Sequence, residues 1–321
     1  MKTNPSKKGQ LLKELRSQRE IISGEQLSAI LGISRVSVWK HIHKLQELGY
    51  QIMSTPNGYQ LIDSPDIPFP WEFADHNFNI LYYPELPSTM DTAKDLARKH
   101  CPDLTVVVAG RQTQGRGRLT RQWRSDDGGL YFTMVLRPKI SLVQCPLINF
   151  AASLVLSQTI QDFCRIDAKV KWPNDILVHD QKISGMLSEM EAEAEEVSFI
   201  NIGIGINVAI PETAAVQIDQ NWTDLRRLTG RETISRNRLA SAVLDHTVAA
   251  LEEFERSGLQ PFLKEWSRHD VIQDRQVSLR LPNEVIEGRA CGIDAGGALL
   301  VDTVSGRRRF ASGEVSLRIA P

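Results

Sequence analysis

The chain has 321 residues, of which 41% are hydrophobic and 24% are charged, a balance that excludes disordered and fibrous proteins. Its 38 Lys and Arg and 39 Asp and Glu give a net charge of −1, but the charge is unevenly spread. Residues 1–62 hold nine basic and four acidic residues, a net of +5, whereas residues 63–321 carry a net of −6. This asymmetry predicts a small module that meets a polyanion, joined to a larger body that does not.

The four cysteines are widely spaced and form no CxxC pair, so we expect reduced thiols and no metal-ligating residues. Charged residues break the segment from Leu11 to Arg19, which excludes a secretory signal core. Nothing in the chain approaches 18 uninterrupted apolar residues. We therefore expect a soluble, cytoplasmic protein with no membrane partner.

The first 62 residues predict a winged helix-turn-helix. Ser23 and Ser34 are placed to cap two helices, one from about Gly24 to Leu31 and one that Gly49 ends, with Gly32 between them. Apolar residues recur in both helices at helical spacing, which gives each helix one inward face. The expected inward residues are Leu27, Ile30 and Leu31 in the first helix, and Val38, Ile42, Leu45 and Leu48 in the second.

Pro56-Asn57-Gly58 predicts a hairpin turn between two short strands, which would form the wing. The outer side of the second capped helix is polar and basic, as expected of a helix that enters the major groove of DNA. Lysines there would mostly meet phosphates, whereas Arg35 and Ser37 are better placed to reach base edges. The alternative is a protein-interaction module whose basic face is only solvated. The predicted DNA-binding residues are Arg35, Ser37, Lys40 and Lys44.

Pro65, Pro68 and Pro70 predict a linker, because proline cannot continue a helix or a central strand. Beyond residue 80, apolar strand-like runs and helical segments are mixed without regular alternation, which indicates an α+β body. Short strands and turn residues from about Val271 onward predict a small β-barrel. The expected domains span residues 1–62, 66–270 and 271–321. The main expected strands cover 104–109, 130–136 and 200–208, and the main expected helices cover 151–163 and 238–254.

Residues 110–124 form an arginine loop with five arginines and no acidic residue, in which Gly115 and Gly117 alternate with Arg116 and Arg118. The spacing matches neither a Walker A loop nor a dinucleotide fingerprint. Glycine lets the backbone approach a ligand closely, and guanidinium groups bind phosphate or carboxylate in bidentate fashion. We expect an anion site, with a solvated basic loop or a second nucleic-acid contact as the alternatives.

Lys182 is expected beside the turn of a hairpin. Pro173 keeps Trp172 out of the helical region, a strand opens at Asn174-Asp175, and Asp180-Gln181 can turn the chain back. A lone lysine at the start of a strand is usually solvated. Its neighbours in the sequence are what make Lys182 a candidate for a site.

Residues 200–208 alternate isoleucine with Asn201, Gly203, Gly205 and Asn207. One face of this strand is therefore a packed apolar layer, and the two glycines strip the other face of side chains. Glycine in a strand usually marks close approach by a ligand or by another element, and both readings stay open here. Asn207 lies at the end of the bare face, where its amide could bind a ligand.

Taken together, these motifs resemble those of the bifunctional biotin–protein ligases and biotin operon repressors, over nearly the whole chain. GRGR followed by W and then KWPND in one chain is highly specific. The matching segments are the winged helix from Ser23 to Ile42, ST at 88–89, GRGR at 115–118, KWPND at 171–175, KISG at 182–185, GIGIN at 203–207 and GEVSL at 313–317.

The resemblance implies a biotin/lipoate ligase-like catalytic domain with a central mixed sheet, followed by an SH3-like C-terminal barrel. It implies that biotin and ATP, with Mg²⁺, form biotinyl-5′-adenylate and pyrophosphate. The biotinyl group then passes to a lysine of biotin carboxyl-carrier protein, an acetyl-CoA carboxylase subunit. It also implies that the adenylate-loaded chain forms a homodimer on operator DNA and represses biotin-synthesis genes.

The resemblance also assigns site residues. Met90 departs from the family, which often has Asn there; a thioether cannot replace the amide donors, although a backbone contact can persist. The chemistry of adenylate formation, rather than the resemblance itself, suggests that Lys182 neutralises developing charge and that Arg116 and Arg118 close over the phosphates. Asp175 is a candidate to orient or deprotonate the incoming lysine. Residues implied to contact biotin or its adenylate are Ser88, Thr89, Met90, Gln112, Arg116, Gly117, Arg118 and Lys182, with Asn207 and Trp222 near the nucleotide.

Two alternatives from other classes remain. One is a lipoate or octanoate ligase or transferase of the same fold, which the arginine loop and the absence of an RRxSGGG-type segment disfavour. The other is a DNA-binding regulator that senses a ligand without catalysis. Sensing alone would not need both Lys182 and Arg118, so their presence favours the enzyme.

Overall fold

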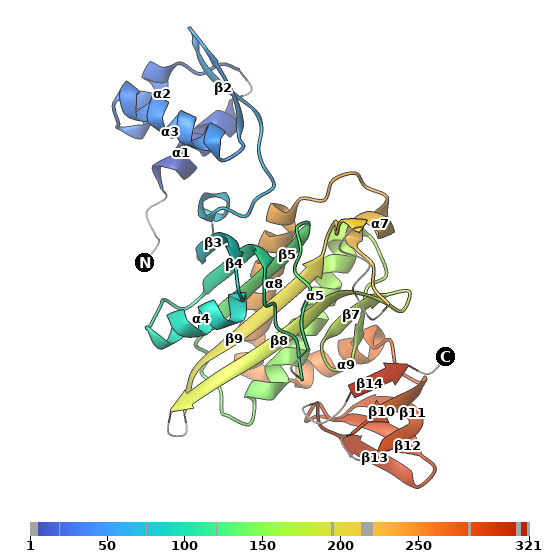
Figure 1. The fold of residues 1–321 in the computed structure, drawn as a ribbon. Helices are drawn as coiled ribbons and strands as arrows, with labels where there is room; N and C mark the ends of the chain where they lie inside the picture. The colour runs from blue at the N-terminus through green and yellow to red at the C-terminus, as the bar shows by residue number, and fades with distance from the viewer. Residues whose placement is uncertain are drawn as a thin grey trace. The chain divides into compact units, whose positions relative to one another are not determined.

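The computed structural model of the protein describes residues 6–18, 20–74, 76–119, 121–193, 196–212, 221–281, 284–312 and 316–319 (Figure 1). The chain divides into two compact units, Met1–Ile80 and Leu81–Pro321. No helix in the described ranges is long and apolar enough to cross a membrane. All four cysteines carry free thiols.

The first unit is a winged helix-turn-helix. The Ser23 hydroxyl accepts a hydrogen bond from the Gln26 amide at 3.1 Å, and the Gln26 side chain accepts one from the Ser23 amide, a complete capping box. Gly32 ends the helix in the left-handed region, with a φ of +62°. The elements are α1 (Lys7–Ser17), α2 (Gly24–Leu31), α3 (Arg35–Glu47), β1 (Gln51–Thr55) and β2 (Gly58–Asp63), the last two forming the antiparallel wing.

The core of this unit confirms most of the predicted inward positions. Val38, Ile42 and Leu45 of α3 are at most 1% exposed. The prediction for Ile30 is wrong, since its side chain is 52% exposed. Leu27 and Leu31 already supply the i, i+4 stripe through which the short α2 meets the core, and Ile30 lies at the edge of that stripe.

The proline-rich segment is a linker only in part. Pro70 begins the 3₁₀ helix η1 (Pro70–Phe73), where its missing N–H costs nothing. The Glu72 carboxylate accepts hydrogen bonds from Arg16 at 2.9 Å and from the Tyr50 hydroxyl, and the Trp71 indole donates to that hydroxyl at 2.8 Å. Burial and the Glu72 charge raise the pKa of Tyr50. The end of the predicted linker therefore folds against the winged helix.

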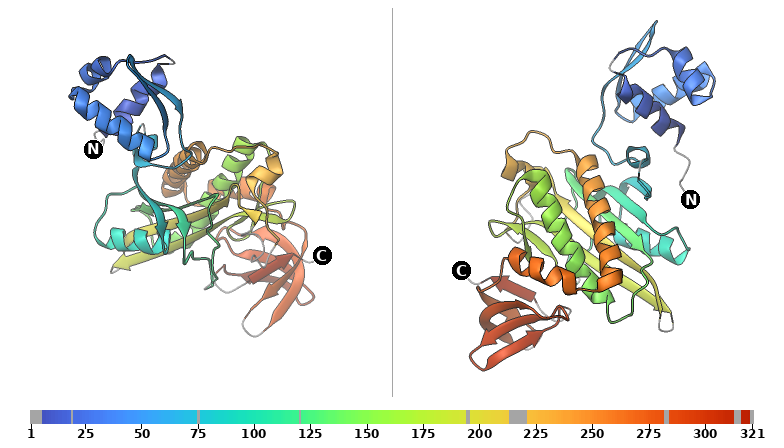
Figure 2. Two further views of the ribbon diagram at one scale, coloured as in Figure 1. Left: turned by 45° about the horizontal axis from the view of Figure 1, so that its top comes forward. Right: turned by 180° about the vertical axis from the view of Figure 1, so that it is seen from behind.

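The second unit is built on a sheet with the strand order β3-β4-β5-β9-β8-β7-β6, antiparallel from β4 to β6. Helices α5, α8 and α9 cover one face of it, and α4 packs on part of the other (Figures 1 and 2). Its strands are β3 (Asn79–Leu86), β4 (Thr105–Gln112), β5 (Gly129–Leu136), β6 (Lys169–Lys171), β7 (Asp175–Val178), β8 (Gln181–Glu193) and β9 (Glu196–Asn207). Its helices are α4 (Thr89–Arg98), η2 (Cys145–Leu147), α5 (Ile148–Cys164), α7 (Leu225–Thr229), α8 (Arg236–Ser257) and α9 (Gln260–His269).

Strand β9 confirms the predicted alternation. Ile202 and Ile206 are fully buried on one face of the sheet, and Gly203 and Gly205 lie on the other. Gly205 pairs with Gly185 on the neighbouring β8, so two residues without side chains lie next to each other. This leaves a gap in the side-chain layer on the α4 side of the sheet.

The C-terminal strands form an antiparallel sheet in the order β13-β12-β11-β10-β14. The indole of Trp172, just after β6, donates to the Gly297 carbonyl at 3.1 Å and ties this sheet to the central one. Closure into a barrel stays a prediction, and the first three residues of the GEVSL motif at 313–317 lie outside the described residues. The strands are β10 (Gln276–Arg280), β11 (Val285–Ile293), β12 (Leu299–Thr303), β13 (Gly306–Phe310) and β14 (Ser316–Ile319).

Candidate active site

One cavity brings together most of the predicted site residues. Its wall is formed by the start of α4, the arginine loop, the β6–β7 turn, the start of β8, the glycines of β8 and β9, and part of β14. Of the predicted residues, those that line it are Ser88, Thr89, Met90, Gln112, Arg116, Gly117, Arg118, Asp175 and Lys182. It is also lined by residues for which we predicted no role, among them Trp123, Thr133, Lys171, Asn174 and Arg318.

At one end, which we call the neutral end, uncharged polar groups already satisfy one another. The Gln112 carbonyl oxygen accepts from the Thr89 amide at 2.7 Å and from the Thr89 hydroxyl at 3.0 Å, and its amide donates to Ser125 at 2.8 Å. Thr133 donates to the Thr89 hydroxyl at 2.9 Å. Ser88, at the N-cap of α4, is 1% exposed. Because each side chain of this hydrogen-bond network has a partner, the network is rigid. The polar groups of the neutral end are therefore held in fixed positions.

The glycines of β8 and β9 make room for side chains of this chain. A Cβ atom on Gly205 would lie 2.4 Å from the indole nitrogen of Trp123, and one on Gly185 would lie 2.9 Å from the same ring. The Trp123 indole N–H is buried and has no hydrogen-bond partner among the described residues. Trp123 therefore covers the bare face of the sheet, with its unpaired indole N–H against β9.

Met90 covers the remaining glycine. A Cβ atom on Gly203 would lie 2.9 Å from the Met90 methyl carbon, and Met90 itself is 3% exposed. The thioether packs as an apolar surface in the cavity and offers no donor. A polar side-chain contact at this position is thus replaced by an apolar one.

At the other end, which we call the cationic end, several positive side chains surround one carboxylate. The Lys182 ammonium lies 2.7 Å from Asp175 and 5.0 Å from the centre of the Trp123 ring. Asp175 is the only acidic residue among the described residues that line the cavity. Arg118 donates to Asn174 at 3.3 Å and to the carbonyl of Ser312. Burial lowers the pKa of Arg118.

Lys171 is a half-buried cation at the same end. Burial lowers the pKa of Lys171; the charges of Lys182 and Arg318 lower it further, against the opposing effect of Asp175. A buried cation whose charged form is disfavoured in this way gains from a bound anion. The cationic end is therefore suited to a polyphosphate.

Asn207 and Trp222 do not line the cavity in the part of the chain that the structure describes. The Asn207 amide donates to the Lys182 carbonyl at 3.4 Å and to the Thr223 carbonyl at 3.1 Å, so it holds the backbone that carries Lys182. The ring of Trp222 faces the guanidinium of Arg227 at 4.8 Å. Asn207 is therefore a positioning residue in this structure.

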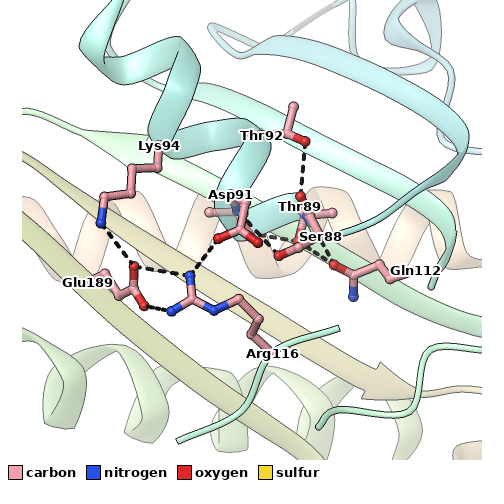
Figure 3. Close-up of polar contacts among 9 residues, drawn as sticks. Ser88, Thr89, Asp91, Thr92, Lys94, Gln112, Arg116 and Glu189 are labelled. Carbon is pink, nitrogen blue, oxygen red and sulfur yellow. Dashed lines mark hydrogen bonds and ion pairs between the residues drawn. The ribbon is translucent and has the colours of Figure 1, made fainter. Parts of the chain in front are cut away.

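The Arg116 guanidinium points toward Asp91 of α4 and Glu189 of β8 (Figure 3). Its guanidinium pairs with Asp91 at 2.6 Å and with Glu189, and Lys94 lies 3.8 Å from Glu189. Burial alone would lower the pKa of Arg116, but the charges of Glu189 and Asp91 raise it overall. In this structure Arg116 ties the arginine loop to α4 and β8; its predicted closure over phosphates is untested.

The four residues predicted to bind DNA lie on α3 in the first unit. Arg35 and Lys40 are exposed and have no hydrogen-bond or ion-pair partner among the described residues. The Lys44 ammonium lies 2.8 Å from Glu47. The Ser37 hydroxyl is 3.0 Å from that of Ser34, whose oxygen caps the helix by accepting from the Ser37 backbone amide. The base contact expected of Ser37 stays a prediction.

Three descriptions of known domains match the chain. The biotin/lipoate A/B protein ligase family matches residues 82–207, an HTH domain matches residues 7–60, and the biotin protein ligase C-terminal domain matches residues 274–318. The structure of the Aquifex aeolicus biotin protein ligase in complex with biotin and ATP is similar, with a TM-score of 0.63 and 32% identity, over 75% of this chain and 99% of that one.

Full-length relatives match as well. The bifunctional ligase/repressor BirA of Bacillus subtilis is 35% identical over 319 residues, which cover 95% of this chain and 97% of that protein. The bifunctional ligase/repressor BirA of Escherichia coli is 31% identical over 310 residues, 94% of each chain. With the cavity, the winged helix and the three domain matches, these relatives show that the chain belongs to the family of bifunctional biotin–protein ligases and repressors.

Proposed function

We propose that the protein condenses biotin with ATP to biotinyl-5′-adenylate, transfers the biotinyl group to a lysine of biotin carboxyl-carrier protein, and represses transcription in response to biotin. The observation that carries the enzymatic part is the cavity with two unlike ends. The neutral end suits an uncharged polar ring, and the cationic end suits the phosphates that must lie next to the reacting carboxylate. Residues 66–270 would form the catalytic domain and residues 271–321 the C-terminal domain, which contributes Arg318 to the cavity wall.

Biotin would bind with its ureido ring at the neutral end. The paired groups of Ser88, Thr89 and Gln112 offer both donors and acceptors to a ring that has two N–H groups and a carbonyl. Trp123 would move off the glycines and cover the apolar sulfur ring, while Met90 forms the apolar floor beside it. The carboxylate tail would then extend toward Lys182.

In the first step a carboxylate oxygen of biotin attacks the α-phosphorus of ATP, and the bond to pyrophosphate breaks. Negative charge develops on the α-phosphoryl oxygens, where Lys182 and Arg118 can stabilise it; one such donor is typically worth about 2.7–4 kcal/mol. Lys171 and Arg318 would hold the leaving pyrophosphate. Mg²⁺ would arrive with ATP, because the described residues contain no cluster of three ligating side chains that could hold it alone.

In the second step the amine of the carrier lysine attacks the acyl carbon of the adenylate. An amide bond forms, AMP leaves, and the amine loses a proton. Asp175, the one acidic residue among the described residues that line the cavity, would accept a hydrogen bond from that amine; Lys182 lies 2.7 Å from it. No Ser or Cys nucleophile is required, because the enzyme itself is never acylated.

The repressor part rests on the winged helix. A lone domain with few phosphate contacts binds DNA weakly, with nonspecific dissociation constants of about 10⁻⁴–10⁻⁶ M. Two copies on one operator, with half-sites spaced by multiples of about 34–36 Å, would bind far more tightly. We therefore propose that adenylate binding favours a homodimer, which makes biotin supply the regulatory signal.

The test of the enzymatic proposal is incubation with biotin, ATP and Mg²⁺ followed by mass spectrometry for biotinyl-adenylate. Parallel reactions with lipoate or octanoate distinguish the alternative ligases of the same fold. We expect adenylate only with biotin. A product with octanoate but not biotin would replace the proposed substrate, and no adenylate with any acid would favour a regulator without catalysis.

A further inference from the structure

The exposed face of α3 carries two large apolar side chains. Trp39 and Val36 are 54% and 62% exposed, whereas Val38 and Ile42, on the other side of the helix, are buried. The ring of His43 meets that of Trp39 edge-on, with 5.5 Å between centroids. Neither Trp39 nor Val36 contributes to the core, and exposed apolar side chains grouped on one face commonly mark a binding surface.

The basic residues around this face of α3 indicate that its binding partner is a polyanion. Arg35 and Lys40 flank Trp39 on the same helix and are exposed. Residues 1–62 carry a net charge of +5, which attracts DNA and repels most basic protein surfaces. Ser37 is half-buried, and its hydroxyl lies 3.0 Å from that of Ser34. The large apolar side chains on the exposed face of α3 are therefore Val36 and Trp39, with Arg35 and Lys40 beside them.

The chemistry of Trp39 and Val36 fits one base in particular. In the major groove only thymine presents a methyl group, next to its O4 acceptor. Valine offers apolar surface alone, and tryptophan offers apolar surface together with one N–H donor. We infer that Val36 and Trp39 read thymine methyl groups in the operator, with the Trp39 indole N–H donating to thymine O4 or to a neighbouring purine N7. The inference rests on the proposed DNA-binding function and adds the residues that set its sequence preference.

The first experiment measures selectivity. Duplexes are selected from a random library with the full chain in the presence of biotin, ATP and Mg²⁺, and Kd is compared between a selected duplex and a shuffled one. Trp39→Ala should reduce the ratio of the two Kd values by about tenfold, the discrimination of one good base contact. The salt slope should be unchanged, because the phosphate contacts remain. Val285→Ala is the matched control, since Val285 is 62% exposed but lies on β11 in the second unit.

The second experiment removes only the methyl group. Each thymine of the selected duplex is replaced in turn by uracil, and the loss in affinity is measured for the wild type, Val36→Ala and Trp39→Ala. Burial of one methyl group is worth about fourfold in affinity, so one or two positions should show that loss in the wild type. At those positions either Val36→Ala or Trp39→Ala should lose no affinity when thymine is replaced by uracil, because that variant already lacks the side chain that contacts the methyl group.

The outcomes separate the inference from the function it rests on. An unchanged ratio in Trp39→Ala and no effect of uracil at any position would overturn the inference while DNA binding stands. If the wild type binds neither duplex with a salt dependence, the DNA-binding function fails and the inference with it. If Trp39→Ala instead shifts the monomer–dimer balance in sedimentation at an unchanged Kd ratio, the face is an interface between copies and the inference is wrong.

Discussion

The cationic end of the cavity and the outer face of α3 are both basic surfaces, but they treat an anion differently. Lys171 and Arg118 are mostly buried, and burial lowers the pKa of each. Arg35 and Lys40 on α3 are exposed, and water screens their charges. Buried, converging cations act strongly on one phosphate group, whereas exposed cations add weak contacts along a polymer. The first arrangement suits catalysis and the second suits reversible binding.

The largest effect should come from the buried surface. Lys182→Ala should reduce adenylate formation by about 10²–10³, as for one lost electrostatic donor, and leave the fold intact. The measurement is pyrophosphate release at saturating biotin. Lys169→Ala is the matched control, because Lys169 pairs with Asp167 at 3.1 Å and does not line the cavity. A Lys182→Ala rate equal to that of the wild type would remove Lys182 from the site.

The next largest effect should be a difference in salt dependence between DNA binding at α3 and ATP binding in the cavity. With three phosphate contacts per monomer, a slope of about −0.9 per contact predicts a roughly fortyfold loss of DNA affinity when salt rises fourfold. Buried pairs are screened much less, so ATP binding should change by only a few-fold over the same range. Fluorescence anisotropy of a labelled duplex and calorimetry with ATP measure the two effects. Equal salt dependence at both surfaces would contradict the comparison.

The pH dependence of ATP binding should further distinguish the buried cations of the cavity from the exposed cations of α3. The pKa of Lys171 is lowered in the free protein, and a bound anion favours its charged form, so binding should take up protons. ATP affinity should fall, by at most tenfold per pH unit, as pH rises through the lowered pKa. Calorimetry in buffers of different ionisation enthalpy measures the protons, and Lys171→Met should abolish this uptake. Proton release by the wild type would show that the sign is wrong.

The smallest effect should be that of one exposed cation. Lys40→Ala should reduce the salt slope of DNA binding by about 0.9, which corresponds to one phosphate contact. Lys264→Ala provides the control, since Lys264 is an exposed lysine on α9 in the second unit. A slope that stays the same in Lys40→Ala would place Lys40 outside the DNA contact.

Local patterns were sufficient wherever the determining interaction is short in sequence. Caps such as Ser23 and Ser34 act within three residues, and the isoleucine alternation of β9 follows from the two-residue period of a strand. The caps and the alternation could both be predicted from the sequence. The resemblance to a known family also predicted that Arg118, Asp175 and Lys182 belong to one site. The error at Ile30 has the same origin, because helical periodicity marks a face without fixing how much of it the core covers.

Other features of the site depend on contacts between segments that are far apart in the sequence, and only the tertiary structure reveals them. Trp123 lies over Gly185 and Gly205 because the arginine loop folds back across β8 and β9, and no local pattern encodes that contact. Arg116 and Arg118 are equivalent in the sequence motif, yet one meets Asp91 and Glu189 while the other meets Asn174. Charge, period and capping are properties of neighbouring residues and can be predicted from sequence. The partner of a side chain, and hence its pKa and its role, is settled only when distant strands pair.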